Sequence, residues 1–323
     1  MRRRQFLSYL TGAALCPQPV LAHDGNKRFR IALITAGSVM LTLNDVREDL
    51  AARGWIEGKN IAFDYGYGND DAARLDQIVA DVVARRVDVI VAWGTLAPLA
   101  AKRGTGSIPI VMAGAGDAVG SGLVSNLARP PENVTGYSFV PPEMSEKRLQ
   151  LIVGSKPGIK RVAIVWNRNN PHSAGVFSEI EKISVRYRVE AVSAPVAGRL
   201  DGEAVFENLV TARCDAIMIV EDPLTNSLLA EIAQRAIESK LPSLGERRAY
   251  AVAGGLISYG PDLDDSARWV AAYVDRILRG ETPADLPVQQ PTKFVLVING
   301  RTAKAIDVNL PFDLLARAEE ILD

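Results

Sequence analysis

The stretch that decides the fold is Val87-Asp88-Val89-Ile90-Val91-Ala92-Trp93, followed at once by Gly94-Thr95 and a predicted helix over residues 96–103. Its first seven residues are nearly all apolar, which is typical of a strand buried on both faces of a parallel sheet. A buried strand that runs through a short turn into a helix is the repeating unit of α/β proteins. The stretch therefore predicts a parallel sheet covered by helices.

The same alternation of strands and helices extends in both directions from this stretch. Expected strands in the first half of the chain are residues 29–36, 60–65, 87–93, 108–113 and 134–139, with helices over 44–53, 71–85 and 96–103. After residue 142 the pattern restarts. Expected strands there are 161–166, 189–194, 216–220, 241–244, 255–259 and 293–298, with helices over 143–153, 173–187, 203–212, 224–239, 262–278, 301–306 and 311–322. The fold class is α/β, and the restart predicts two doubly wound parallel-sheet domains.

Proline-containing segments mark where the chain is expected to pass between the two domains. Val140-Pro141-Pro142 interrupts the first alternation, and Gly260-Pro261 ends the last strand before the long helix. Proline fixes φ and lacks an N–H donor, so it favours a connection over a regular element. The proline-flanked residues 286–290 are a candidate for a third crossing. The 323 residues suit two α/β domains of about 120–150 residues each.

The N-terminus carries the pattern of an export signal. Three arginines, Arg2 to Arg4, precede a mostly apolar run over residues 6–15, and Val20-Leu21-Ala22 offers small or apolar residues to a signal peptidase. We expect residues 1–22 to be a signal peptide cleaved after Ala22. Arg3-Arg4-Gln5-Phe6-Leu7 also resembles a twin-arginine motif, so the general secretory and twin-arginine routes both stay open. A lipoprotein anchor at Cys16 is disfavoured because Leu15 is too large for the preceding position.

Charge and composition exclude several classes of function. Without residues 1–22 the chain has 34 basic and 38 acidic residues, a net charge of −4, which disfavours a nucleic-acid partner. No further apolar run reaches the length of a membrane span, so we expect no membrane insertion of the mature chain. Its two histidines, His23 and His172, and its two cysteines, Cys16 and Cys214, give metal sites and histidine-based catalysis little material.

One glycine-rich loop invites comparison with nucleotide-binding loops. Gly114 to Gly120 follows an expected strand but has the spacing G-x-G-x-x-x-G, one residue longer than the dinucleotide fingerprint. It also follows the fourth strand instead of the first. A nucleotide-dependent oxidoreductase is therefore a weak alternative, and we expect no cofactor and no catalytic residues.

Candidate binding residues lie where the expected strands end. Ligands of parallel sheets bind beyond the carboxyl ends of the strands, near helix N-termini that offer free N–H groups. The candidates from this rule are Ser38, Thr95, Asp117, Asn167, Asp222 and Tyr259. Hydroxyl and backbone N–H groups suit a carboxylate, acidic side chains suit an ammonium, and an aromatic ring suits an apolar group, which together match a zwitterion such as an amino acid. The same residue types also cap helices for structural reasons, so both interpretations remain open.

Several blocks in order carry a family resemblance. They are residues 54–61 (GWIEGKNI), 87–91 (VDVIV), 108–111 (IPIV), 116–124 (GDAVGSGLV), 127–130 (LARP), 133–136 (NVTG), 253–260 (AGGLISYG), 272–280 (AYVDRILRG) and 284–294 (ADLPVQQPTKF). The chain resembles the tryptophan/tyrosine-type ABC transporter substrate-binding family, whose members have the type I periplasmic binding fold. It departs from the family pattern at Ala118, where proline is usual, and in the more basic segment 246–250.

The resemblance implies a fold of two lobes joined by three crossings, and a function without catalysis. We expect a first lobe of residues 29–140 plus 261–281 and a second lobe of residues 141–260 plus 288–323. It also implies a periplasmic, monomeric protein that holds a small molecule, often an aromatic amino acid, between its lobes. The implied partners are an ABC permease and its ATPase.

Two other functions would share this architecture. A sensory binding protein that serves a chemoreceptor or a histidine kinase would have the same fold and ligand. The effector domain of a transcription regulator is disfavoured because no helix-turn-helix precedes residue 29 and the export signal argues against it.

Overall fold

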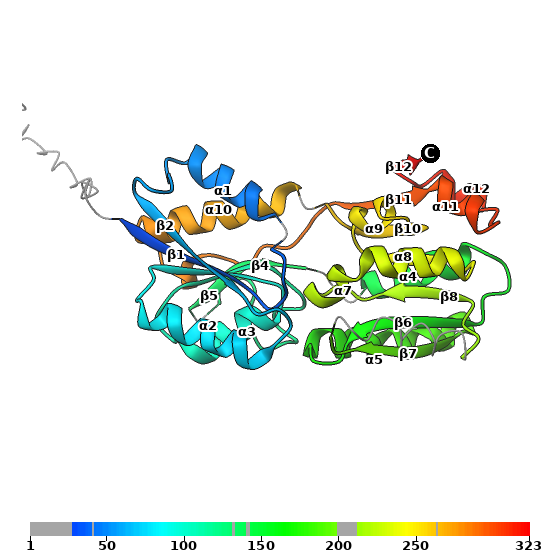
Figure 1. The fold of residues 1–323 in the computed structure, drawn as a ribbon, viewed down its shortest axis with the longest axis horizontal. Coiled ribbons are helices and arrows are strands. Elements are labelled where there is room, and N and C mark those ends of the chain that lie inside the picture. The colour runs from blue at the N-terminus through cyan, green and yellow to red at the C-terminus, as the bar shows by residue number, and fades with distance from the viewer. Residues whose placement is uncertain (1–27, 41, 131–132, 140–142, 199–211, 263) are drawn as a thin grey trace, which may run out of the picture.

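The computed structural model describes residues 28–40, 42–130, 133–139, 143–198, 212–262 and 264–323. The expected signal peptide (1–22) and the expected helix over 203–212 lie outside this range, except for residue 212. The described chain forms two lobes, each built on its own sheet and lying side by side along the long axis of the molecule (Figure 1).

The first lobe contains a five-stranded sheet with the order β2-β1-β3-β4-β5. Every pair in it is parallel. Its strands are β1 (Phe29–Thr35), β2 (Ile61–Tyr67), β3 (Val89–Trp93), β4 (Ile110–Ala115) and β5 (Val134–Ser138). All five residues of β3 are buried, as the apolar run from Val87 to Trp93 predicts.

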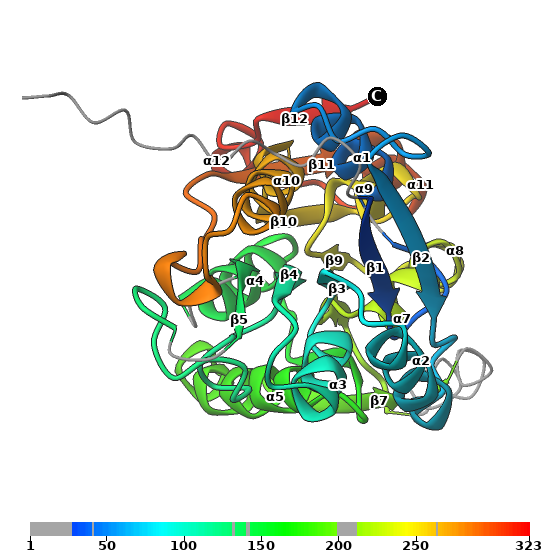
Figure 2. The same ribbon diagram turned by 90° about the vertical axis from the view of Figure 1, so that its left-hand side faces the viewer.

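Both faces of this sheet are covered because its side chains alternate. In β1, Ile31 and Leu33 belong to a cluster with helices α1 (Leu43–Ala52) and α10 (Asp264–Leu278). Ala32 and Ile34 belong to a cluster with α2 (Ala72–Ala84) and α3 (Leu96–Gly104) on the opposite face. Successive strand residues point to opposite faces, so one apolar strand supplies both cores. Figure 2 shows the two helical layers above and below the sheet.

The second lobe contains a seven-stranded sheet with the order β12-β11-β10-β9-β8-β6-β7. Its strands are β6 (Arg161–Asn167), β7 (Glu190–Val196), β8 (Ala216–Ile219), β9 (Ser243–Gly245), β10 (Ile257–Pro261), β11 (Phe294–Asn299) and β12 (Glu320–Leu322). Its helical segments are α4 (Glu143–Gly154), α5 (Pro171–Ser184), η1 (Val185–Tyr187), α7 (Pro223–Ser227), α8 (Leu229–Glu238), α9 (Arg248–Val252), α11 (Gly300–Ala305) and α12 (Phe312–Leu315).

The two sheets share one strand order. In each, the first strand lies between the second and the third, so the direction of winding reverses between β1 and β3 and again between β6 and β8. These reversals are topological switch points, where loops diverge and leave a crevice at the carboxyl edge.

The second sheet differs from the expected all-parallel arrangement. Strand β11 runs antiparallel to β10, with Pro261 opposite Phe294. The chain leaves the second lobe at the end of β10 and returns from the first lobe at the start of β11, so the two strands must point in opposite directions. The prediction of a helix over 311–322 is also wrong. This segment forms only the short α12, followed by the strand β12, which pairs with β11.

The described elements place three passages of the chain between the lobes. They run from β5 to α4, from β10 to α10, and from the 3₁₀ helix η3 (Pro283–Asp285) to β11. Val288 belongs to a core cluster of the first lobe, and Gln289 pairs with Tyr137 of β5. The second lobe therefore resumes after Gln289, slightly later than the boundary at residue 288 that we expected.

None of the helices in the described part of the chain is both long and apolar enough to cross a membrane.

Candidate ligand-binding site

A cavity of about 320 Å³ lies between the two lobes. From the first lobe it is lined by residues that follow β3, β4 and β5, including Gly94, Gly116 and Phe139. From the second lobe it is lined by the starts of α5 and α7 and by one face of α4. The cavity therefore lies at the carboxyl edges of both sheets, beside both switch points, which is where the topology favours a ligand.

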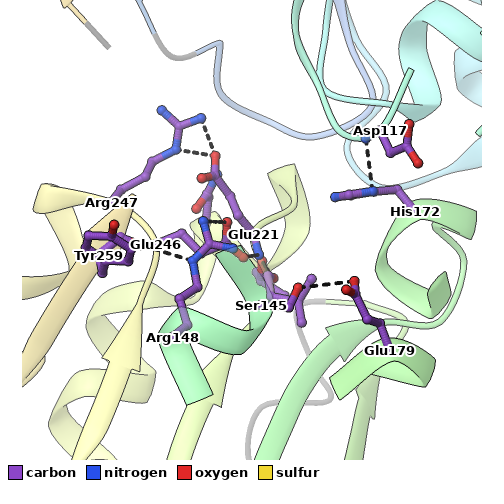
Figure 3. A network of polar contacts seen from close by, with 12 residues as sticks. Asp117, Ser145, Arg148, His172, Glu179, Glu221, Glu246, Arg247 and Tyr259 are labelled. Carbon is purple, nitrogen blue, oxygen red and sulfur yellow. Dashed lines mark hydrogen bonds and ion pairs between the residues drawn. The ribbon is translucent and has the colours of Figure 1, made fainter. Parts of the chain in front are cut away.

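The two lobes touch each other across this cavity. The imidazole Nδ1 of His172, on α5, accepts a hydrogen bond from the backbone N–H of Asp117 at 3.1 Å (Figure 3). Pro223, the first residue of α7, lies against Gly94, where an added Cβ would be 2.8 Å from its Cγ. An added Cβ at Gly116 would lie 2.3 Å from the His172 ring. The first lobe therefore carries glycines where side chains of the second lobe come closest.

The wall from the first lobe is small and weakly polar. Thr95 is 2% exposed, and its hydroxyl accepts a hydrogen bond from Gly116 N at 2.9 Å. Asp117 Oδ1 accepts from Val119 N and Gly120 N, so this carboxylate closes its own turn. Trp93 and Phe139 add aromatic surface to the same wall.

Asp222 holds together two loops of the second lobe. Its Oδ1 accepts hydrogen bonds from Asn167 Nδ2 at 2.8 Å and from Leu224 N at 2.7 Å, and its Oδ2 accepts from Asn170 Nδ2 at 2.6 Å. Burial raises the pKa of Asp222, while the hydrogen bonds from Asn170 and Asn167 act in the opposite direction. Asp222 thereby caps α7 and fixes the loop after β6 to the loop after β8.

Two ion pairs form a further part of the second-lobe wall (Figure 3). Arg148 Nη2 lies 2.9 Å from Glu246 Oε2, with side chains only 3% and 10% exposed, and Arg148 Nε donates to the carbonyl of Tyr259. Arg247 pairs with Glu221. Burial raises the pKa of Glu221 and nearby Glu246 raises it further, whereas Arg247 lowers it. Each arginine thus offsets a carboxylate that would be costly to bury alone.

The cavity is therefore unequal on its two sides. The first lobe presents glycines, hydroxyls and aromatic rings, and the second presents carboxylates and guanidinium groups. Arg247 connects the two sides, since its Cζ lies 5.2 Å from the centre of the Phe139 ring. Such a cavity suits a small ligand that has both an apolar part and charged groups. Within the ranges that the structure describes, no group of His, Cys, Asp and Glu side chains is arranged to hold a metal ion.

Comparison with known protein families assigns the chain to one of them. The family described as ABC transporter substrate binding protein matches residues 31–322, nearly all of the described chain. This chain belongs to that family.

Individual relatives of this substrate-binding protein agree with the assignment. The tyrosine-binding protein of Clostridioides difficile strain R20291 is 25% identical over 259 residues, which are 80% of this chain and 74% of the relative. A solved structure of a conserved domain protein from Vibrio cholerae is 28% identical with a TM-score of 0.84, covering 91% of this chain and all of that one. A structure from Streptococcus pneumonia in complex with L-Trp is 22% identical with a TM-score of 0.83, covering 92% of this chain and all of that one. The fold is that of periplasmic binding proteins.

The structure brings three of the six candidate residues to the cavity. Thr95, Asp117 and Asp222 line it. Asn167 lies behind the wall, bonded to Asp222, and Ser38 belongs to the loop after β1 without lining the cavity. The Tyr259 ring is also absent from the lining and packs against Phe294, with 6.2 Å between ring centres. In this substrate-binding protein Asn167 therefore supports the wall by donating to Asp222, and the backbone carbonyl of Tyr259 accepts a hydrogen bond from Arg148.

The strand-end rule misses the cavity residues of α4. Ser145 and Arg148 both line the cavity, yet α4 follows a crossing between lobes instead of a strand. Phe139 is also missed, because the expected strand 134–139 includes it, whereas β5 ends at Ser138 and leaves Phe139 as the residue that follows the strand. An arginine on a mostly apolar helical face is the signal that marks Arg148, because burying a lone guanidinium is unfavourable.

Proposed function

We propose that this protein is the extracytoplasmic solute-binding component of an ABC importer and that it binds an amino acid or a closely related zwitterion. The observation that carries the proposal is the cavity between the lobes, which presents charges of both signs beside two aromatic rings. A zwitterion with an apolar side chain has matching groups. The ligands named for the relatives, tyrosine and L-Trp, belong to this class.

The ligand is proposed to bind by closure of a hinge between the lobes. The contacts of His172 with Asp117 and of Pro223 with Gly94 join the two lobes across the cavity and support this proposal. A ligand favours closure only if it contacts both lobes, because it must interact more strongly with the closed form than with the open one. A cavity with walls from both lobes supplies such contacts.

The cellular setting is part of the proposal. Residues 1–22 act as a signal peptide, and the mature protein works as a monomer in the periplasm. It presents its closed form to a permease that is driven by an ATPase. The arginine-rich start and the apolar run that follows support export. The membership in the substrate-binding family supports the transporter partners.

A thermal-shift panel tests the ligand class. The mature chain, residues 23–323, is heated with amino acids, small carboxylates, purines or sugars. A ligand at about 100 times its Kd adds about 2.7 kcal/mol to the free energy of unfolding, which raises Tm by several degrees. We expect the largest shifts with amino acids that have large apolar or aromatic side chains. Shifts confined to sugars or purines would overturn the ligand class and leave the solute-binding role.

Transport is tested separately from binding. A strain that lacks this gene is compared with the parent for uptake of the radiolabelled solute that gives the largest shift. Loss of uptake supports the importer role. Unchanged uptake together with a lost chemotactic or transcriptional response to that solute would replace it with a sensory role.

A further inference from the structure

Asp117 and Asp222, the carboxylates expected to bind a ligand ammonium, already accept hydrogen bonds from the protein itself. Asp222 uses both carboxylate oxygens for Asn167, Asn170 and Leu224 N. Asp117 uses Oδ1 for two backbone N–H groups of its own turn, and its Oδ2 lies against that same turn, where an added Cβ at Gly120 would be 2.1 Å away. A cationic nitrogen of the ligand therefore needs another acceptor within the cavity.

Glu221 is placed to be that acceptor. It lines the cavity at the end of β8, and its side chain is 12% exposed. Oε1 accepts from Arg247 Nε and, at 3.3 Å, from Asn226 Nδ2. Among the described residues none donates a hydrogen bond to its other oxygen, Oε2. One oxygen thus fixes the carboxylate in place, and the other is left for a ligand.

The surroundings of Glu221 favour a positive charge at Oε2. The carboxylate of Glu246 is close enough that its Oε1 accepts a hydrogen bond from Glu221 N at 3.0 Å. Arg148 pairs with Glu246 and Arg247 with Glu221, which fixes both carboxylates in place at the cavity wall. The raised pKa of Glu221 agrees with this picture, since burial and a neighbouring carboxylate both penalise its negative charge in the absence of a further cation.

We propose that Glu221 Oε2 binds a cationic nitrogen of the ligand, so that this protein selects solutes carrying an ammonium group over otherwise identical acids. The inference rests on the proposed function and narrows its ligand class. Arg247 is a positioning residue for this contact, because it holds Oε1 while its guanidinium packs over Phe139 of the first lobe. The acceptor is therefore held at the point where the two lobes meet.

Matched ligand pairs test the inference by isothermal titration calorimetry. Each pair is an amino acid (L-tyrosine, L-tryptophan or L-leucine) and its desamino analogue, the same acid with hydrogen in place of the ammonium group. We expect the wild type to bind the amino acid of the best pair more tightly than its analogue. Glu221→Gln should weaken amino-acid binding by about 10- to 100-fold, the range of a charged hydrogen bond, and change the analogue by less than about threefold.

Two further variants keep the test decisive. Glu231→Gln removes the same charge from an exposed position on α8 of the same lobe and should change neither affinity. Glu221→Gln leaves Arg247 without its carboxylate, so the double variant Glu221→Gln/Arg247→Met removes both charges and carries the test if the single variant unfolds. It should likewise lose the preference for the amino acid.

The outcomes separate this inference from the proposed function. Equal weakening of both members of a pair by Glu221→Gln would assign Glu221 a role in cavity shape only and overturn the inference. Wild-type binding of the analogues as tight as that of the amino acids would also overturn it, while solute binding would stand. Binding of no member of any pair would overturn the inference together with the amino-acid class.

Discussion

At the scale of single residues, His172 joins the two lobes through a hydrogen bond that depends on its protonation state. Nδ1 acts as an acceptor only while the imidazole is neutral. Burial lowers the pKa of His172 from its ordinary 6.5, and Arg148 lowers it further, whereas Asp117, Asp222 and Glu221 act in the opposite direction. Because the closed form has the lowered pKa, an open form that exposes the ring takes up the proton more readily.

This linkage predicts a pH dependence of ligand affinity. Well above the ordinary histidine pKa of 6.5 the ring is neutral in both forms, and closure carries no cost from His172. As the pH falls below that value, the open form is protonated first, so affinity should fall by at most about tenfold per pH unit. Calorimetry between about pH 5 and about pH 8, the range in which histidine titrates, measures the ligand affinity as a function of pH.

The control for this prediction is His172→Asn, which retains an acceptor near the position of Nδ1 but does not titrate. We expect the variant to bind with a flatter pH profile. An unchanged slope in His172→Asn would assign the dependence to the other groups of the cavity, Asp222 and Glu221 among them.

Gly116 is the second residue on which closure depends. An alanine Cβ there would lie 2.3 Å from the His172 ring, so Gly116→Ala should oppose closure. The cost of such overpacking, about 1–3 kcal/mol, corresponds to a loss of about 5- to 150-fold in ligand affinity. The Tm of the ligand-free protein should change little, because the open form has no such contact. Calorimetry and a thermal scan give the two quantities.

Gly106→Ala is the matched control. Gly106 belongs to the same lobe, and an added Cβ there would have no neighbouring atom within 4 Å. It should leave affinity unchanged. Full affinity in Gly116→Ala would mean that the binding form does not contain the contact between Gly116 and His172.

At the scale of secondary-structure elements, Asp222 decides how the loops after β6 and β8 are joined. Asp222→Ala removes the cap of α7 and leaves the side-chain amides of Asn167 and Asn170 without their acceptor. We expect the free energy of unfolding to fall by about 2–4 kcal/mol, a cap plus the loss of buried hydrogen bonds. Urea denaturation measures it.

A simpler cap provides the comparison for Asp222. Asp71 accepts from Ala73 N and Arg74 N at the exposed start of α2 and holds no second loop. Asp71→Ala should therefore cost only about 1 kcal/mol. Equal losses for the two variants would show that Asp222 acts as a cap alone.

Elements were predictable where their pattern is local. The apolar run from Val87 to Trp93 becomes β3, and the long pattern after residue 262 becomes α10. The direction of β11 and the existence of strand β12 could not be predicted, because both depend on pairing with strands elsewhere in the chain. Glu320–Leu322 is too short to specify a strand alone and forms one only by pairing with β11.

At the scale of the whole molecule, the proposed hinge lies at the three crossings between the lobes. Two of the three passages lie together, because Asp262 N donates to Lys293 O at 3.0 Å and the Lys293 ammonium lies 2.6 Å from Asp262 Oδ2. Rotation there leaves each sheet and its helices intact, which is how hinge motions preserve packed cores.

Hinge closure predicts that the molecule becomes more compact when it binds. The radius of gyration from small-angle X-ray scattering should decrease when a saturating amino acid from the thermal-shift panel is added to the wild type. The decrease should be smaller in Gly116→Ala. An unchanged radius in the wild type with a tightly bound ligand would rule out a large hinge motion.

The sequence by itself determined the α/β class, the alternation of elements, the family, and three residues of the cavity, Thr95, Asp117 and Asp222. These follow from local information, since an apolar run, a turn and a helix start are neighbours in the chain. Only the tertiary structure decided that Asp117 closes its own turn, that Asp222 joins two loops, and that Arg148 pairs with Glu246, nearly one hundred residues away. Burial and pairing of charges depend on which segments meet in space, and in this protein the crossings between the lobes decide that.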